Sequence, residues 1–136
     1  DVEYFQNTSI ECDLRLPRAI TDYPLSSEAR HNLFLTFEEV LNNVLKHSKA
    51  TKVKVEMTLH AADFEIKIAD NGRGFEISKI FSANYAPSNK RGGNGLKNMR
   101  QRLADVGGEF FIRSEPQSGT TITLRLPLAK KHIKKL

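Results

Sequence analysis

The chain has 136 residues and a mass of 15.4 kDa, which suits one domain with a hydrophobic core and is too short for two. Hydrophobic residues make up 39% of it, and no apolar run is long enough for a membrane-spanning helix, so we expect a soluble globular domain without a signal peptide. The net charge of +5 depends mostly on four lysines near the C-terminus, and the single cysteine, Cys12, excludes an internal disulfide and favours a reducing compartment.

The first two predicted elements follow from hydrophobic periodicity. Apolar residues at every second position over residues 10–16 predict a strand that stops before Pro17. Ser26 or Ser27 can cap a helix that runs to about Ser48, because apolar residues recur there at helical spacing. These residues are Leu33, Phe37, Val40, Leu41, Val44 and Leu45.

The middle of the chain is predicted to form a hairpin and a long loop. Two runs of alternating apolar residues, 53–59 and 64–68, indicate antiparallel strands. Periodicity then lapses over residues 76–94, a stretch that is longer than most connections and contains several glycines, asparagines and serines. We therefore predict a mobile lid that becomes ordered when a ligand binds.

The last third of the chain is predicted to add a second helix and a second hairpin. Apolar residues at helical spacing begin near Gly95 and stop at Gly107 and Gly108, which suit a left-handed C-terminal cap. Residues 109–114 and 120–128 are predicted strands on either side of a turn.

This order of elements predicts a single domain over residues 1–136, built as a two-layer α/β sandwich with helices on one face of a mixed sheet. Residues 1–24 supply an N-terminal strand and turn, and residues 25–128 form the core. Residues 129–136 are expected to be a basic, solvated tail.

Four polar residues near the end of the first predicted helix are candidates for a site. Glu39, Asn43 and His47 are four residues apart, and Lys46 lies three beyond Asn43, so a regular helix places them on one stripe. An acid, an amide oxygen and a cation in a row can serve a divalent metal and phosphates. A solvated helix face with ordinary side-chain pairs remains the alternative.

A second candidate lies at the end of the second hairpin strand. Asp70 shares the parity of the inward-facing apolar residues, so its carboxylate needs a donor, either a turn amide or the amine of a ligand. Gly72 and Gly74 indicate a sharp bend or a close approach. The alternative is a tight turn that the aspartate caps.

Two further candidates lie near the C-terminal elements. Residues 92–95 place glycine amides at the positive end of the second helix, where phosphate binds readily, although a flexible hinge is equally compatible. Thr120 shares the inward parity of its predicted strand and offers a hydroxyl there, or is an ordinary strand threonine.

Taken in order, these motifs resemble the GHKL (Bergerat) family of ATP-binding domains. The resemblance consists of an acid and an asparagine on a helix (39–43), Asp-x-Gly-x-Gly at a strand end (70–74), Gly-x-Gly-Leu at a helix start (93–96) and Gly-Thr on a strand (119–120). The family includes gyrase, heat-shock-90-type chaperones, MutL and sensor histidine kinases. The resemblance implies a mixed, mostly antiparallel sheet with helices on one face.

Within that family, residues 39–47 and 93–102 most resemble the ATP-binding domain of nitrate-sensor and DesK-like histidine kinases. The resemblance implies that ATP and Mg²⁺ are the cofactors and that Asn43 binds the metal. Glu39 would orient a metal-bound water or help to activate the acceptor, and Lys46 and His47 would lie near the phosphates. Asp70 would accept the adenine amine. The nucleotide-binding residues implied are Asn43, Asp70, Gly72, Gly74, Gly93, Gly95, Leu96 and Thr120.

The implied activity is ATP-dependent phosphorylation of a histidine within two-component signal transduction. No segment resembles the helical hairpin that carries the acceptor histidine, so the implied partners are that dimerisation domain of the parent chain and a response regulator, with no nucleic acid and no membrane contact. We expect a cytoplasmic domain, whose parent protein is anchored in the membrane in many such kinases. The alternatives are an anti-sigma-factor-type serine kinase and a non-catalytic domain that binds anions or nucleic acid.

Overall fold

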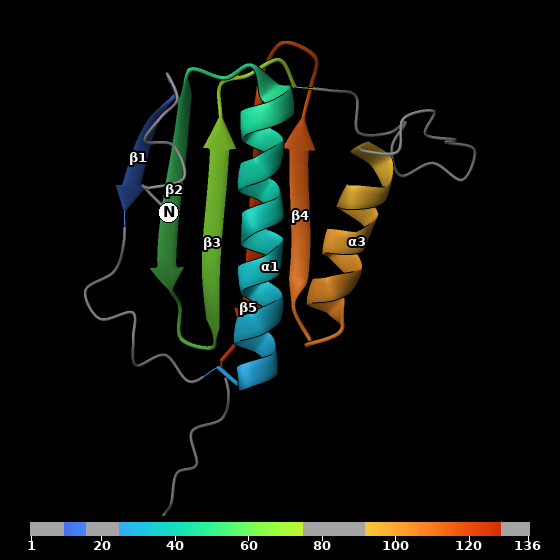
Figure 1. The fold of residues 1–136 in the computed structure, drawn as a ribbon. Coiled ribbons are helices and arrows are strands. Elements are labelled where there is room, and N and C mark those ends of the chain that lie inside the picture. Colours follow the sequence, from blue (N-terminus) through green and yellow to red (C-terminus); the bar gives the residue numbers. More distant parts are fainter. Residues whose placement is uncertain (1–9, 16–24, 75–91, 129–136) are drawn as a thin grey trace, which may run out of the picture.

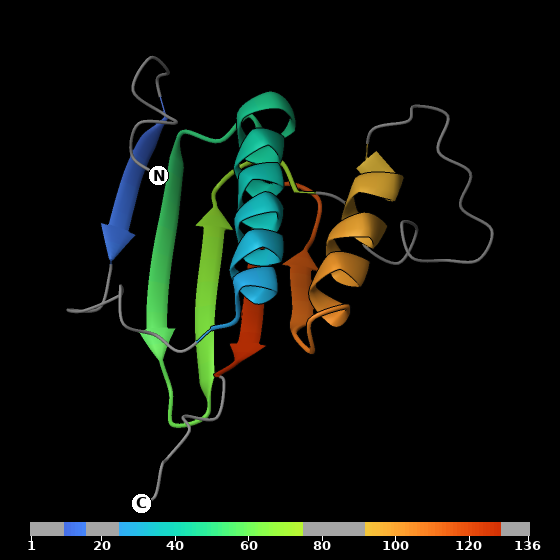
Figure 2. The ribbon, with the colours of Figure 1, turned by 60° about the horizontal axis from the view of Figure 1, so that its bottom comes forward.

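The computed structural model describes residues 10–15, 25–74 and 92–128, and it shows two layers, a five-stranded sheet and helices on one of its faces (Figures 1 and 2). The strands are β1 (Glu11–Arg15), β2 (Lys52–Leu59), β3 (Asp63–Asp70), β4 (Glu109–Ser114) and β5 (Thr120–Pro127). The helical elements are α1 (Ser27–Asn43), the π-helical turn η3 (Val44–Ser48) and α3 (Gly92–Ala104).

The sheet has the strand order β1-β2-β3-β5-β4. β1 pairs with β2 in parallel, and every other neighbouring pair is antiparallel. The predicted two-layer α/β sandwich with a mixed, mostly antiparallel sheet is therefore confirmed. Both predicted hairpins form, because each pair of alternating runs has a short connection and one apolar face to bury.

Helix α1 begins as predicted but ends earlier. The Ser26 hydroxyl accepts a hydrogen bond of 3.0 Å from the Ala29 amide and so caps the helix. After Asn43 the α-helix gives way to the π-helical turn, and Lys49 then adopts a left-handed conformation with φ of 56°. The helical segment therefore ends at Ser48 as predicted, but its last turn is π-helical, and the Ser48 carbonyl accepts a hydrogen bond of 2.7 Å from the Arg73 amide.

Helix α3 begins at Gly92, three residues before the predicted start at Gly95. The helical spacing of apolar residues can be recognised only from Leu96 onward. The first turn of a helix needs no apolar residue when the following residues are anchored in the core, and Leu96 is buried there. The end is as predicted. Gly107 has φ of 80°, and the Gly108 amide donates to the Leu103 carbonyl at 2.8 Å.

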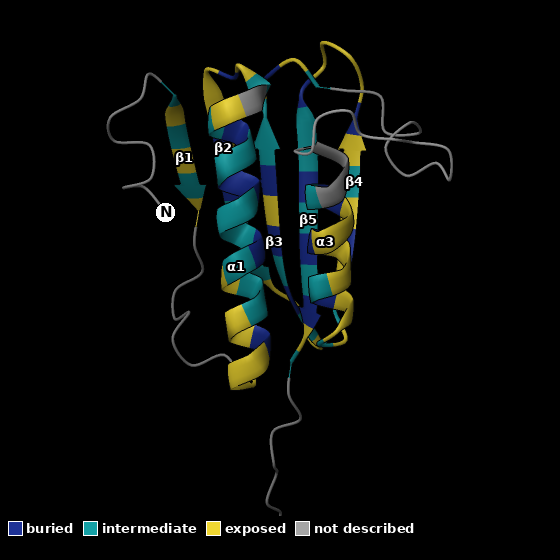
Figure 3. Ribbon diagram, turned by 45° about the vertical axis from the view of Figure 1, so that its right-hand side comes forward, coloured by how far each residue is buried: buried dark blue, intermediate teal, exposed yellow. Residues whose placement is uncertain are grey.

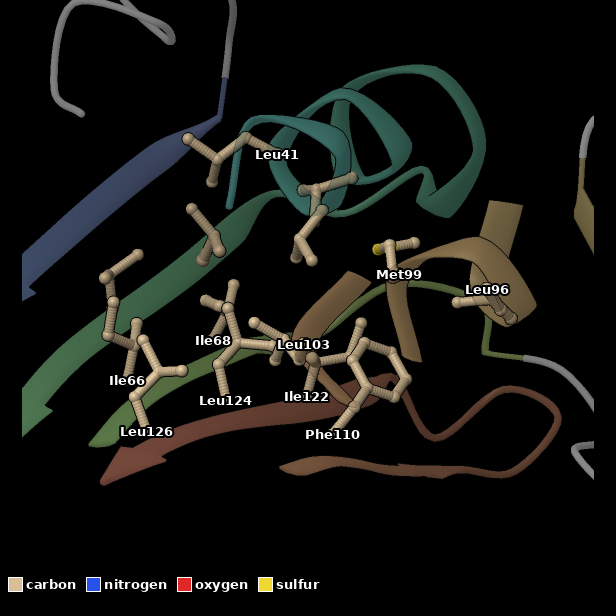
Figure 4. Close-up of a cluster of buried hydrophobic side chains, with 14 of the residues drawn as sticks. Leu41, Ile66, Ile68, Leu96, Met99, Leu103, Phe110, Ile122, Leu124 and Leu126 are labelled. Atoms are coloured by element: carbon tan, nitrogen blue, oxygen red, sulfur yellow. The ribbon is translucent and has the colours of Figure 1, made fainter. Parts of the chain in front are cut away.

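The hydrophobic core lies between the helices and the covered face of the sheet (Figures 3 and 4). Leu41 from α1 and Met99 and Leu103 from α3 are fully buried against the strands. The Asn32 side-chain amide also donates to the Arg102 carbonyl at 2.9 Å and so joins the two helices. The buried hydrophobic residues of the strands are Val53, Val55, Phe64, Ile66, Ile68, Phe110, Ile122, Leu124 and Leu126.

Three sequence predictions fall wholly or partly outside the described residues. They are the lid over residues 76–94, of which only residues 92–94 are described, the N-terminal strand and turn over residues 1–24, of which only residues 10–15 are described, and the basic tail over residues 129–136. Within the described ranges, no helix is long and apolar enough to cross a membrane.

Candidate functional site

One end of the sheet brings together most of the predicted site residues. The end of α1 with η3, the end of β3, the start of α3 and the turn between β4 and β5 all lie at this end (Figure 1). The backbones of η3, of the segment after β3 and of the β4–β5 turn come into close contact. A Cβ atom added to Gly72 would lie 2.2 Å from the Ser48 carbonyl oxygen, and one added to Gly119 would lie 2.3 Å from the Asp70 carbonyl oxygen. The four motifs, far apart in sequence, therefore lie at the same end of the sheet and are the candidate site.

Glu39 and Asn43 lie one turn apart on α1 and are both half-buried. The Glu39 carboxylate is next to the start of α3, because a Cβ atom added to Gly95 would lie 3.4 Å from Glu39 Oε2. The first turn of α3 has amide donors without partners in the helix and carries the positive end of the helix dipole. The Glu39 carboxylate thus adjoins a helix N-terminus, and Asn43 lies one turn further along α1.

Lys46 and His47 lie in the π-helical turn after α1 rather than in α1 itself. Both belong to η3, whose π-helical hydrogen bonding differs from that of the α-helix on which the predicted stripe depends. Lys46 is exposed, and the side chain of His47 is outside the described part of the structure. That Lys46 and His47 share one stripe with Glu39 and Asn43 therefore stays a prediction.

Asp70 is the half-buried carboxylate at the end of β3. Its Oδ1 accepts a hydrogen bond of 2.7 Å from the Gly72 amide, and the carboxylate also accepts one from the Thr120 amide of β5. Burial raises the pKa of the Asp70 carboxyl above its ordinary value, and the two amide donors oppose this shift only in part. The sequence predicted an inward-facing acid that needs a donor, and the turn amide, one of the two donors considered, is present.

Glycines shape the backbone around Asp70. Gly74 has φ of 62°, and a Cβ atom there would lie 2.1 Å from the Glu115 carbonyl oxygen, so only glycine fits at this position. The Arg73 carbonyl accepts a hydrogen bond from the Gln117 amide, which ties this segment to the β4–β5 turn. The segment after β3 is therefore held on two sides, by η3 and by that turn.

Three predicted nucleotide-binding residues lie on α3, namely Gly93, Gly95 and Leu96. Gly93 belongs to the first turn of the helix rather than to a loop before it. The Leu96 side chain is 5% exposed and packs in the hydrophobic cluster, so it anchors the helix start and contributes no side-chain group to the polar site. Any contact of Leu96 with a nucleotide would therefore be made by its backbone, and its assignment as a nucleotide-binding residue stays a prediction.

Thr120 and a residue that sequence reasoning missed, Ser114, complete the site. Thr120 lies opposite Asp70 on one side and opposite Ser114 of β4 on the other. The Ser114 and Thr120 hydroxyl oxygens are 2.8 Å apart, and Ser114 is buried. The signal was available, because Ser114 is a polar residue with the inward parity of Phe110 and Ile112 at the end of a strand.

The donor set suits Mg²⁺ only in combination with a ligand's own oxygens. Mg²⁺ prefers amide, carboxylate and phosphate oxygens and keeps several waters, and Asn43 with the neighbouring Glu39 offers the first two kinds. The described residues contain no group of three or more His, Cys, Asp and Glu side chains that could hold a metal ion by themselves.

The sequence matches the model of one known protein family over residues 28–130. That family is described as histidine kinase-, DNA gyrase B- and HSP90-like ATPases. The chain belongs to this family. The match covers α1 through β5, and membership in an ATPase family implies that this domain uses a nucleotide.

Among curated proteins, the chain is similar to the sensor protein VraS of staphylococci. It is 35% identical to VraS of Staphylococcus epidermidis and 34% identical to VraS of Staphylococcus aureus, each over 118 residues. The aligned region is 87% of this chain and 31% of the relative in both cases, so the chain spans about a third of the length of these relatives.

Among solved structures, the chain is similar in fold to histidine kinase domains. The histidine kinase domain of the blue-light activated kinase of Erythrobacter litoralis EL346 has a TM-score of 0.69 at 18% identity, covering 93% of this chain and 57% of that one. The kinase AdeS of Acinetobacter baumannii has a TM-score of 0.68 at 15% identity, covering 94% and 59%. At these identities the likeness concerns the fold.

Proposed function

We propose that this ATPase domain is the catalytic part of a sensor histidine kinase of the nitrate-sensor and DesK-like kind, which binds Mg-ATP and donates the γ-phosphoryl group to a histidine on a separate dimerisation domain. The observation that carries the proposal is the convergence of Asp70, Thr120, Asn43 and the start of α3 at one end of the sheet in a chain of this family. Similarity to VraS supports the kinase assignment within the family.

Recognition of the base is assigned to the Asp70 end of the site. The half-buried carboxylate has two backbone donors and keeps acceptor capacity for an exocyclic amine such as that of adenine. Gly72 and Gly74 allow the backbone to bend closely around it, and Thr120 adds a hydroxyl on the same face. Guanine has a carbonyl in place of this amine, so the arrangement favours ATP over GTP.

Binding of the phosphates is assigned to the region between α1 and α3. The amides of the first turn of α3, including those of Gly93 and Gly95, are suited to phosphate oxygens. The exposed Lys46 side chain, three residues after Asn43, would add a positive charge. Asn43 would hold Mg²⁺, which when bound neutralises phosphate charge and orients the terminal phosphate. Glu39 would orient a metal-bound water or help to activate the acceptor.

Phosphoryl transfer needs little covalent chemistry from the protein, so positioning and electrostatic stabilisation would supply most of the catalysis. The partners proposed are the histidine-bearing domain of the parent chain and a downstream response regulator, and the proposed location is the cytoplasm. His47 adjoins the metal-binding turn of α1 in sequence and is assigned to the vicinity of the phosphates, not to the role of acceptor.

The test is calorimetric titration of Mg²⁺ and a non-hydrolysable ATP analogue into Asp70→Ala and Asn43→Ala. We expect Asp70→Ala to weaken binding by about 1.5–3 kcal/mol, the scale of a hydrogen bond to a charged group, and Asn43→Ala to abolish the dependence on Mg²⁺. Asp63→Ala is the matched control, since Asp63 begins the same strand at the opposite end of the sheet. Unchanged affinity in both site variants would contradict the proposal.

A second experiment separates the kinase from its rivals. With labelled ATP, the isolated chain should incorporate no acid-labile phosphate, and adding the helical domain of the parent protein should produce label on that domain. Label on a serine of an added anti-sigma-type substrate would instead support the serine kinase. Binding of RNA or DNA without any Mg-ATP binding would support the non-catalytic alternative.

A further inference from the structure

We propose that Ser114 is a positioning residue that orients the Thr120 hydroxyl for recognition of the nucleotide base. This inference rests on the proposed function, because it concerns the base-binding end of the same site. Ser114 lies on β4 directly opposite Thr120, which in turn lies opposite Asp70, so the three side chains form one row across three strands.

Ser114 is the buried end of this row. Its side chain is 7% exposed, whereas Thr120 and Asp70 are half-buried and lie progressively nearer to the middle of the sheet. Ser114 Oγ is 3.1 Å from the Gly119 carbonyl oxygen and 2.8 Å from Thr120 Oγ1. A serine in contact with both the backbone and the side chain of the adjoining strand is able to restrict the rotamer of Thr120.

The number of protons available sets the direction of these hydrogen bonds. The Gly119 carbonyl can only accept, and a serine hydroxyl has a single proton to donate. Both contacts form together only if Ser114 donates to Gly119 and Thr120 donates to Ser114. Thr120 then uses its proton within the protein and presents lone pairs on its remaining side.

The consequence is a row of acceptors at the base-binding end. The Thr120 amide donates to the Asp70 carboxylate, so Thr120 is linked to Asp70 through its backbone and to Ser114 through its side chain. An amine of the base can donate to Asp70, and a water that donates to Thr120 can use its other proton for a ring nitrogen. Without Ser114 the Thr120 hydroxyl loses its fixed direction, and this arrangement is no longer organised in advance.

The test is a double-mutant cycle of Ser114→Ala and Thr120→Val, with the Kd of the Mg-bound ATP analogue measured by calorimetry. Ser114→Ala should weaken binding about three- to tenfold, the effect of one neutral hydrogen bond. In the Thr120→Val background, the same change should alter the Kd less than about twofold, because Ser114 acts through the threonine hydroxyl. The melting temperature of each variant verifies that it is folded.

A GTP analogue tests whether Ser114 acts on base recognition or only on the structure. A purely structural role of Ser114 would not change the ratio of the Kd values for the ATP and GTP analogues. Ser114→Ala should reduce the preference for the ATP analogue over the GTP analogue, since only the adenine arrangement depends on the oriented hydroxyl. Equal weakening of both analogues, equal effects of Ser114→Ala in both backgrounds, or unchanged or tighter ATP binding would overturn the inference. If one of these results is found but Asp70→Ala still weakens binding of the ATP analogue, only the inference about Ser114 is wrong. If Asp70→Ala does not change that affinity, the proposed function itself is contradicted.

Discussion

Two neighbouring rows on the covered face of the sheet differ in a way that explains where the site lies. Val55, Ile68, Ile122 and Ile112 are cross-strand neighbours, and two residues further along the strands the row is Val53, Asp70, Thr120 and Ser114. The strands and the face are the same. The first row is entirely apolar, and the second replaces three apolar side chains with a carboxylate and two hydroxyls.

The difference shows how a stable core and a polar site share one set of strands. In the apolar row, burial removes hydrocarbon from water and stabilises the fold. In the polar row every group needs a partner, and backbone amides, the Gly119 carbonyl and the hydroxyl pair supply them. Among the described side chains that are not exposed, no buried nitrogen or oxygen atom lacks a hydrogen-bond partner. The polar row therefore stays folded and retains acceptor capacity.

The largest effect is expected from the apolar row. Ile68→Ala removes a side chain that is 2% exposed at the centre of the core, which should lower the free energy of unfolding by about 2–5 kcal/mol. Urea unfolding measures this loss. Lys67→Ala, the exposed neighbour on the open face, is the control and should change stability by less than about 0.5 kcal/mol. Similar losses in the two variants would contradict the division of the sheet into two faces.

The second largest loss of stability is expected from replacing Gly72, which lies beside the polar row. Gly72→Ala places a Cβ atom 2.2 Å from the Ser48 carbonyl oxygen, a backbone atom that cannot move away freely, so we expect a loss of about 1–3 kcal/mol. Gly95→Ala is the matched control, because its Cβ atom would lie 3.4 Å from the end of the flexible Glu39 side chain. Thermal unfolding of both variants checks the pair, and equal tolerance would show that η3 and the segment after β3 can separate.

On the open face of the sheet, removing a charge should have a smaller effect. Glu65 lies 3.2 Å from both Arg125 and His60, and Arg125 also stacks 5.2 Å from the centre of the exposed Phe111 ring. Surface ion pairs of this kind contribute up to about 1 kcal/mol, so Glu65→Gln should lower stability by no more than that, and less at high salt. A loss as large as that of Ile68→Ala in urea unfolding would contradict this estimate.

The smallest change in stability is expected for Asp70→Asn, and this substitution should stabilise the fold rather than destabilise it. Because burial raises the pKa of Asp70 in the folded state, the carboxylate destabilises the fold above that pKa, and its contribution improves as the pH falls. Asp70→Asn keeps an oxygen for the Gly72 amide and should therefore melt at a slightly higher temperature at pH 7. This advantage should shrink as the pH is lowered. Melting curves at several pH values test it, and an Asn variant that is less stable at pH 7 would show that the two amide bonds outweigh burial.

Much of the fold could be predicted from the sequence, because strict alternation and helical spacing report which residues face the core. Ile66 and Ile68 indicated β3 and its inward face, and the same parity identified Asp70 as an acid that needs a donor. The four site motifs were also recognisable, since each combines an unusual residue type with the end of an element. Their roles in nucleotide binding remain predictions.

Contacts between segments that are far apart in the chain could be seen only in the tertiary structure. The sequence by itself determined the elements, the covered face and the polar residues at strand ends, because these depend on the order of side chains along one segment. Tertiary contacts decided that α1 ends in a π-helical turn beside Arg73, that Glu39 adjoins Gly95, and that Ser114 binds Thr120. Each of these joins segments far apart in the chain or pairs neighbouring strands in register, and periodicity within one segment carries no information about such a partner.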